Sequence, residues 1–198
     1  MSYTATERFG MESAPGGLAL VQELLNTIGV GGPSHPDLLQ EVRPAQEWLN
    51  AALERWAEAT GAGRPPDIAL TERDLPRLRA LRDRLRAGLN HQNPSDAEPT
   101  RPGPEPTGSL RLALTSDGRI EVHPEGRGAR WITSSLLGEI YDAQQNDTWR
   151  RLKICRSEKC AVAFYDRSRN NSGVWHDVRV CGNAVNLRAS RARRGQLP

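Results

Sequence analysis

Three stretches in the N-terminal half carry apolar residues at the spacing of an amphipathic helix that faces a core. The predicted helices cover residues 18–29, 38–61 and 71–90. The side chains expected in the core are Leu18, Val21, Leu24, Leu25, Ile28, Ala45, Trp48, Leu49, Ala52, Leu53, Trp56, Leu75, Leu78, Leu81, Leu85 and Leu89. Residues 1–17 are polar and rich in glycine, and we expect them to form a frayed terminus.

Two details concern the starts and surfaces of these helices. Pro44 is expected in the first turn of the second helix, where a missing N–H costs little. Thr71 is a candidate cap for the third helix. Five arginines lie between Arg77 and Arg86, but Asp74 and Asp83 temper their charge. A solvated helix face is therefore favoured there over a DNA-binding surface.

Beyond a Pro/Gly-rich loop at 93–109, the pattern changes from helical to alternating. Apolar and polar residues alternate on both sides of Asp117-Gly118, which predicts a β-hairpin. A short strand near Trp131 is then expected, followed by a helix capped by Thr133 or Ser134. The buried side of that helix is expected to consist of Leu136, Leu137, Ile140, Tyr141 and Ala143.

Charge divides the chain unevenly. The net charge is +3, yet residues 150–198 hold 12 Lys+Arg and 3 Asp+Glu, a net of +9, which leaves −6 for residues 1–149. A basic C-terminal part indicates a polyanionic partner, most commonly nucleic acid. No apolar run is long enough to cross a bilayer and no export signal is evident, so a reducing cytoplasm is the expected compartment.

All three cysteines and one of the four histidines fall in one short window. Their arrangement is Cys155-x4-Cys160-x15-His176-x4-Cys181. Two close pairs of thiolate or imidazole donors, joined by a spacer that lets them converge, match the tetrahedral preference of zinc. We therefore predict one zinc ion per chain. A complete set of four ligands, three of them thiolates, favours a structural role over catalysis.

The segment after Cys181 is predicted to be a basic helix, with Asn183 as its cap. Asparagines can read base edges, whereas arginines contact phosphate or guanine. The residues expected to contact nucleic acid are Arg167, Arg169, Asn183, Asn186, Arg188, Arg191, Arg193 and Arg194. Further cations at Arg150, Arg151, Lys153, Arg156, Lys159 and Arg179 are expected to surround the same unit.

These residues resemble the CGNR zinc-finger family of bacterial proteins. The resemblance rests on Cys155 and Cys160, the stretch 164–169, Trp175-His176, and the run from Cys181 to Ala184. His176 stands where the family usually has its third cysteine, and Ala184 replaces the arginine of the name motif. The N-terminal part, with "LALVQELLNT" and "EWL", looks like the ABATE-like domain of stress-induced transcription regulators that normally accompanies this finger.

The resulting prediction is an α+β fold. Residues 1–148 would form a mainly helical domain with a β-hairpin, and residues 149–198 a small treble-clef-like zinc finger ending in a basic helix. The resemblance implies a transcriptional regulator that binds double-stranded DNA. RNA or RNA polymerase as the partner is the alternative. An enzyme in the N-terminal domain is less favoured, because no catalytic motif occurs there. A small-molecule effector and a homodimer remain open.

Overall fold

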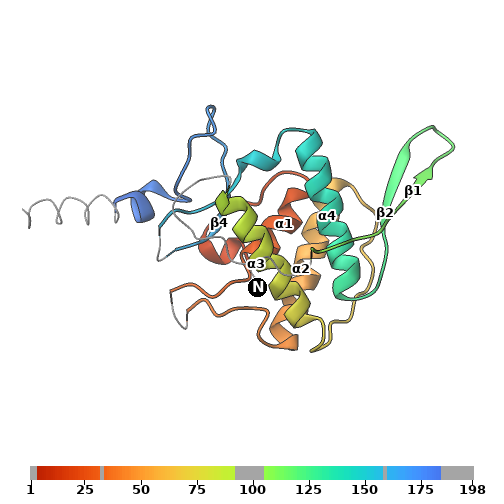
Figure 1. Cartoon of the computed structure of the whole chain (residues 1–198), viewed down its shortest axis with the longest axis horizontal. Coiled ribbons are helices and arrows are strands. Elements are labelled where there is room, and N and C mark those ends of the chain that lie inside the picture. Colours follow the sequence, from red (N-terminus) through yellow and green to blue (C-terminus); the bar gives the residue numbers. More distant parts are fainter. Residues whose placement is uncertain (1–3, 32–33, 92–104, 158–159, 184–198) are drawn as a thin grey trace, which may run out of the picture.

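The computed structural model describes residues 4–31, 34–91, 105–157 and 160–183. In these ranges the chain forms four α-helices, two antiparallel two-stranded sheets and three short helical turns. This arrangement confirms the predicted α+β class (Figure 1). None of the helices in the described ranges is long and apolar enough to cross a lipid bilayer.

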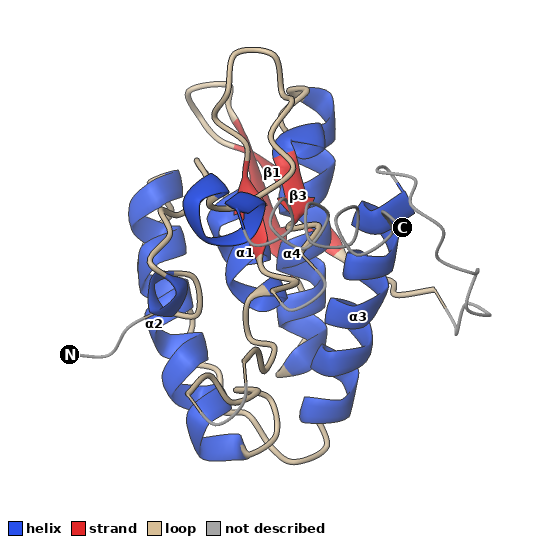
Figure 2. Ribbon diagram, turned by 90° about the vertical axis from the view of Figure 1, so that its left-hand side faces the viewer, coloured by secondary structure: helices blue, strands red, loops and turns tan. Residues whose placement is uncertain are grey.

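Helix α1 (Leu18–Leu25) lies at the centre of the molecule, where it packs against α2, α3, α4 and β4 (Figure 2). All eight of its residues are buried, including the polar Gln22 and Glu23. Buried polar groups require hydrogen-bond partners. The Glu23 carboxylate accepts bonds from the backbone N–H groups of Ala5 (2.8 Å) and Thr6 (3.0 Å). Residues 4–16 are thus held against the core by hydrogen bonds. The prediction of a frayed terminus is wrong for these residues.

Helix α2 (Val42–Thr60) follows the predicted pattern closely. Pro44 lies in its first turn, and Gly61 ends it with a φ of 69°, in the left-handed region that glycine enters without strain. The whole predicted stripe is buried, namely Ala45, Trp48, Leu49, Ala52, Leu53 and Trp56. The apolar spacing alone was therefore sufficient to orient this helix.

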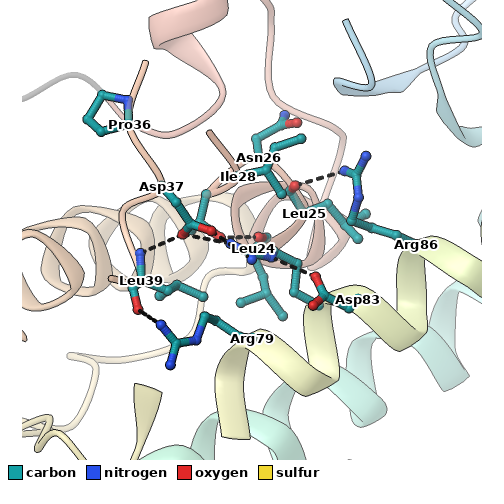
Figure 3. A network of polar contacts seen from close by, with 12 residues as sticks. Leu24, Leu25, Asn26, Ile28, Pro36, Asp37, Leu39, Arg79, Asp83 and Arg86 are labelled. Carbon is teal, nitrogen blue, oxygen red and sulfur yellow. Dashed lines mark hydrogen bonds and ion pairs between the residues drawn. The ribbon is translucent and has the colours of Figure 1, made fainter. Parts of the chain in front are cut away.

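Helix α3 (Leu75–His91) differs from prediction on its arginine-rich side. Arg82 is buried and forms a bidentate ion pair with Asp37, both bonds being 2.8 Å long. Arg79 and Arg86 reach backbone carbonyls of the neighbouring segment 25–39 (Figure 3). The expectation of a solvated face is wrong for these three arginines, because this segment turns back over the helix and supplies acceptors. Thr71 lies before the helix, where its hydroxyl donates to Asp74.

Helix α4 (Ala129–Gln145) begins earlier than predicted, so the expected strand near Trp131 is absent and the expected caps Thr133 and Ser134 lie inside the helix. Its first N–H, from Ala129, donates to the Asp74 carboxylate at 3.0 Å. A residue distant in sequence therefore satisfies the helix end, which explains why no local cap signal marked it. Leu136, Ile140 and Ala143 are buried as predicted, but Tyr141 is 63% exposed.

The predicted hairpin consists of β1 (Leu110–Leu114) and β2 (Ile120–Pro124). Its turn contains Gly118 with a φ of 82°, which accounts for the glycine at that position. The hairpin projects from one end of the long axis, and the turn at Val178–Gly182 lies towards the other end (Figure 1). The apolar side chains of this hairpin are largely exposed, which alternation alone did not predict.

A second hairpin pairs β3 (Leu152–Ile154) with β4 (Ala163–Tyr165) and packs against α1 and α3. Leu152, Ile154 and Ala163 belong to the same hydrophobic core as the helices. The Asn26 side chain brackets Ala163, accepting its N–H at 2.8 Å and donating to its carbonyl at 2.9 Å. The C-terminal segment is thus fastened to α1. The boundary at residues 148 and 149 stays a prediction.

Candidate metal centre

The first ligand pair lies on the turn of the β3–β4 hairpin. Cys155 follows β3, and its N–H donates to the carbonyl of Val162 at 2.8 Å. The N–H of Cys160 donates to the carbonyl of Ser157 at 2.8 Å, and Ala161 then adopts a positive φ of 54°. This tight reversal directs both cysteine side chains to one side. This turn, from Cys155 to Cys160, is called the knuckle below, and it holds the first close pair of donors that the spacing predicted.

Of the second pair, Cys181 lies in a short helical turn (Val178–Gly182) and His176 lies just before that turn. The first N–H groups of the turn are capped by Asp177. The Asp177 side chain accepts from the N–H groups of Arg179 (2.6 Å) and Val180 (3.1 Å), while its carbonyl accepts from Cys181. This capping fixes Cys181 relative to His176. An N–H bond of 3.1 Å from Arg156 to the carbonyl of Val174 ties the incoming segment to the knuckle.

The four predicted ligands meet at one point. Their donor atoms all lie within 4.8 Å of one another, and among the described residues this is the one such group. Nδ1 of His176 is 3.3 Å from Sγ of Cys160 and 3.5 Å from Sγ of Cys181. Tetrahedral zinc, with Zn–S of about 2.3 Å and Zn–N of about 2.0 Å, requires donor separations of about 3.5–3.8 Å. The donor set and its geometry fit a single zinc site, as predicted.

The thiols influence one another's protonation. A hydrogen bond from Cys160 lowers the pKa of Cys155 to about 3, with His176 contributing in the same direction. The bond to Cys155 raises the pKa of Cys160, and burial raises that of Cys181. The three thiols are therefore electrostatically coupled. A bound dication would supply the charge that deprotonates Cys160 and Cys181.

Apolar side chains and one partly buried cation enclose the centre. Val162 and Phe164 pack beside the cysteines, and Phe9, Met11 and Trp175 cover them from outside. The guanidinium of Arg86 donates to the carbonyl of Ala161, next to Cys160. Burial lowers the pKa of Arg86 to about 10. Zinc with three thiolates would carry a net charge of −1, which Arg86 is placed to offset.

A buried ion pair holds the loop between the two ligand pairs. Asp166 accepts from Nζ of Lys153 at 2.7 Å and from the N–H of Gly173 at 2.7 Å. Lys153 also donates to the backbone carbonyls of Asn171 and Gly173. Lys153 is therefore a buried residue that holds the loop in place. The prediction that it lies on the basic surface is wrong. No local pattern marks this role, because lysine in a basic segment is usually exposed.

The residues predicted to contact nucleic acid are only partly within the described ranges. Arg167 donates to the carbonyl of Ser13 and pairs with Glu12, so the N-terminal segment engages it. Arg169 and Asn183 are exposed. Two further cations near the metal centre, Arg156 and Arg179, are exposed as well. Outside the described residues lie Asn186, Arg188, Arg191, Arg193 and Arg194.

Comparison with known families agrees with this geometry. Residues 151–194 match the family model of the CGNR zinc finger. A search of curated proteins gives no match to the chain. Residues 151–194 are therefore similar to a CGNR zinc finger, and within them Cys155, Cys160, His176 and Cys181 form a Cys3His site for a single zinc ion.

Proposed function

We propose that this protein is a cytoplasmic transcriptional regulator that binds double-stranded DNA through its zinc finger, and that it is not an enzyme. The observation that carries the proposal is the basic surface of the zinc finger, a unit that a bound metal would make rigid. The finger belongs to a segment with a net charge of +9, and Arg156, Arg169 and Arg179 are exposed around the metal centre. A rigid scaffold that presents cations suits the phosphate backbone of a duplex.

The proposed role of zinc is structural. Four protein donors would fill all four positions of a tetrahedral zinc ion and leave none for a reacting water molecule. The cysteines are buried, and the aromatic and apolar side chains around them keep solvent away. Zinc would hold the knuckle and the Val178–Gly182 turn together, so that the chain beyond Cys181 has a fixed starting point.

The test is fluorescence anisotropy with duplexes selected from a random pool by the zinc-loaded full chain. We expect the logarithm of affinity to fall linearly with the logarithm of salt concentration, by about 0.9 per phosphate contact. Replacing both Arg169 and Arg179 by glutamine should lower the slope by about two contacts. Arg64→Gln, which changes an equally exposed arginine on the loop after α2, is the matched control and should bind like the parent.

The outcomes separate the alternatives. An affinity independent of salt would exclude binding through phosphates and so contradict the proposal. Single-stranded RNA that competes better than the selected duplex would favour the RNA-binding alternative. Loss of binding after treatment with a chelator, with recovery on adding zinc, is the result expected of a structural metal.

A further inference from the structure

A groove of about 790 Å³ lies at the end of the molecule opposite the zinc finger, between the β1–β2 hairpin and helices α2 and α4. Its volume is within the usual range for small-molecule sites, about 300–1,000 Å³. The groove is formed entirely by residues outside the finger. What it would bind is a question separate from the proposed DNA contact.

One wall of the groove is the apolar face of the hairpin. Leu110, Leu112, Val122 and Pro124 line it, and Leu112 pairs directly with Val122 across the strands. The two are 65% and 52% exposed. Apolar surface of this extent is normally covered in a soluble protein or serves as a binding surface. A hydrocarbon body lying against this face would remove it from water.

The opposite wall is aromatic and acidic. Trp56 from α2 and Tyr141 from α4 face the groove, together with the carboxyl groups of Glu139 and Asp142. The indole N–H of Trp56 donates to Oε1 of Glu139 at 2.7 Å, which orients the carboxyl group. Burial raises the pKa of Glu139, and the neighbouring Asp142 adds to the rise. No lysine, arginine or histidine of the described chain lines the groove.

Glycines create the space in front of this carboxyl group. A Cβ atom at Gly17 would come within 1.4 Å of Oε2 of Glu139, so any other residue there would displace the carboxyl group. Gly16 and Gly138 also line the groove without side chains. The second oxygen of Glu139 consequently lies against backbone, where no cation of the described chain neutralises it.

We propose that this groove binds a small organic cation with a hydrocarbon body, such as a protonated aryl-alkyl amine. The ammonium group pairs with Glu139, close to Asp142 and to the faces of the aromatic rings. The hydrocarbon lies between Tyr141 and the Leu112–Val122 pair. Two carboxyl groups without a lining cation select against anions, and the apolar wall selects against small inorganic cations. The proposal does not depend on the proposed DNA binding.

The test uses three probes of the same shape on the zinc-loaded full chain, measured by calorimetry. The probes are 4-phenylbutylamine, which is protonated at neutral pH, 4-phenylbutan-1-ol and 4-phenylbutyrate. We expect the amine to bind about tenfold more tightly than the alcohol, and the acid to bind more weakly still. Glu139→Gln keeps the shape and an acceptor for Trp56, and it should reduce the amine's affinity to that of the alcohol.

Two variants complete the design. Glu54→Gln removes an exposed carboxyl group elsewhere on α2 and should leave all three affinities unchanged. Leu112→Ser should weaken the amine and the alcohol alike, because it removes part of the shared apolar wall. Equal binding of amine and alcohol by the parent, no binding at all, or unchanged amine affinity in Glu139→Gln would each overturn the proposal. Self-association of the chain that Leu112→Ser abolishes would assign the groove to a second copy and overturn it too.

Discussion

At the scale of single residues, Asp166 shows how the finger loop is held. Its side chain is 4% exposed, and it accepts bonds from Lys153, Ser168 and Gly173. Burial alone would raise its pKa, but these hydrogen bonds, that from Lys153 first, lower the pKa well below the ordinary 3.8. Removing one partner of a buried ion pair is costly in stability, because the charge that remains is neither paired nor solvated by water.

Asp166→Asn should therefore destabilise the protein by about 3 kcal/mol, since it leaves the Lys153 ammonium buried without its counter-ion. Urea unfolding of the zinc-loaded protein measures the change. Asp147→Asn, which alters an exposed carboxylate paired with Arg150, is the control and should have little effect. Equal losses of unfolding free energy in the two variants would mean that the buried Lys153–Asp166 pair contributes no more to stability than an exposed pair does.

The same carboxyl group should make stability depend on pH. Because its folded-state pKa is lowered, its contribution is complete above the ordinary pKa and is lost as the pH falls towards the folded value. The stability difference between the parent and Asp166→Asn should shrink progressively below about pH 5. Acid also releases zinc, but it does so in both proteins, so the difference isolates Asp166. A constant difference down to about pH 2 would contradict this assignment.

At the scale of elements, the sequence predicted what local spacing controls. The apolar stripe of α2, the turn at Gly118 and each of the two ligand pairs are encoded by residues close together in the sequence. The sequence did not predict contacts between residues that are far apart along the chain. Asp74 provides the start of α4, Asp37 draws Arg82 inward, and the polar face of α1 is buried by residues 4–16.

Asn26 connects two elements that are distant in sequence, α1 and β4. Its side chain bonds both backbone groups of Ala163, as a residue of a neighbouring strand would. Asn26→Ala would leave the N–H and the carbonyl of Ala163 buried without this partner, and we expect a loss of about 2–4 kcal/mol. Chemical denaturation followed by tryptophan fluorescence provides the measurement. Asn50→Ala, at an exposed position of α2, should be neutral or slightly stabilising because alanine favours helix.

At the scale of the whole molecule, the β3–β4 hairpin of the finger belongs to the same core as the helices, and the cysteines form a second cluster beside it. Leu152, Ile154 and Ala163 pack with α1 and α3, while Phe9 and Met11 from the N-terminal segment cover the cysteines. Arg86 links α3 to the knuckle, and Asn26 links α1 to β4. A metal that orders the finger should therefore also stabilise helices far from it in sequence.

Hydrogen exchange with and without a chelator tests this coupling. Removing zinc should raise exchange about tenfold or more in β3 and β4, and also in α1 and the C-terminal half of α3. The β1–β2 hairpin, at the opposite end of the molecule, should change least. His176→Ala should reproduce the pattern without chelator, and added zinc should not reverse it. If exchange rises only in residues 149–183, the two parts unfold independently, and the boundary at residues 148 and 149 separates two domains. If exchange in α1 rises as well, zinc occupancy also controls the stability of the core helix.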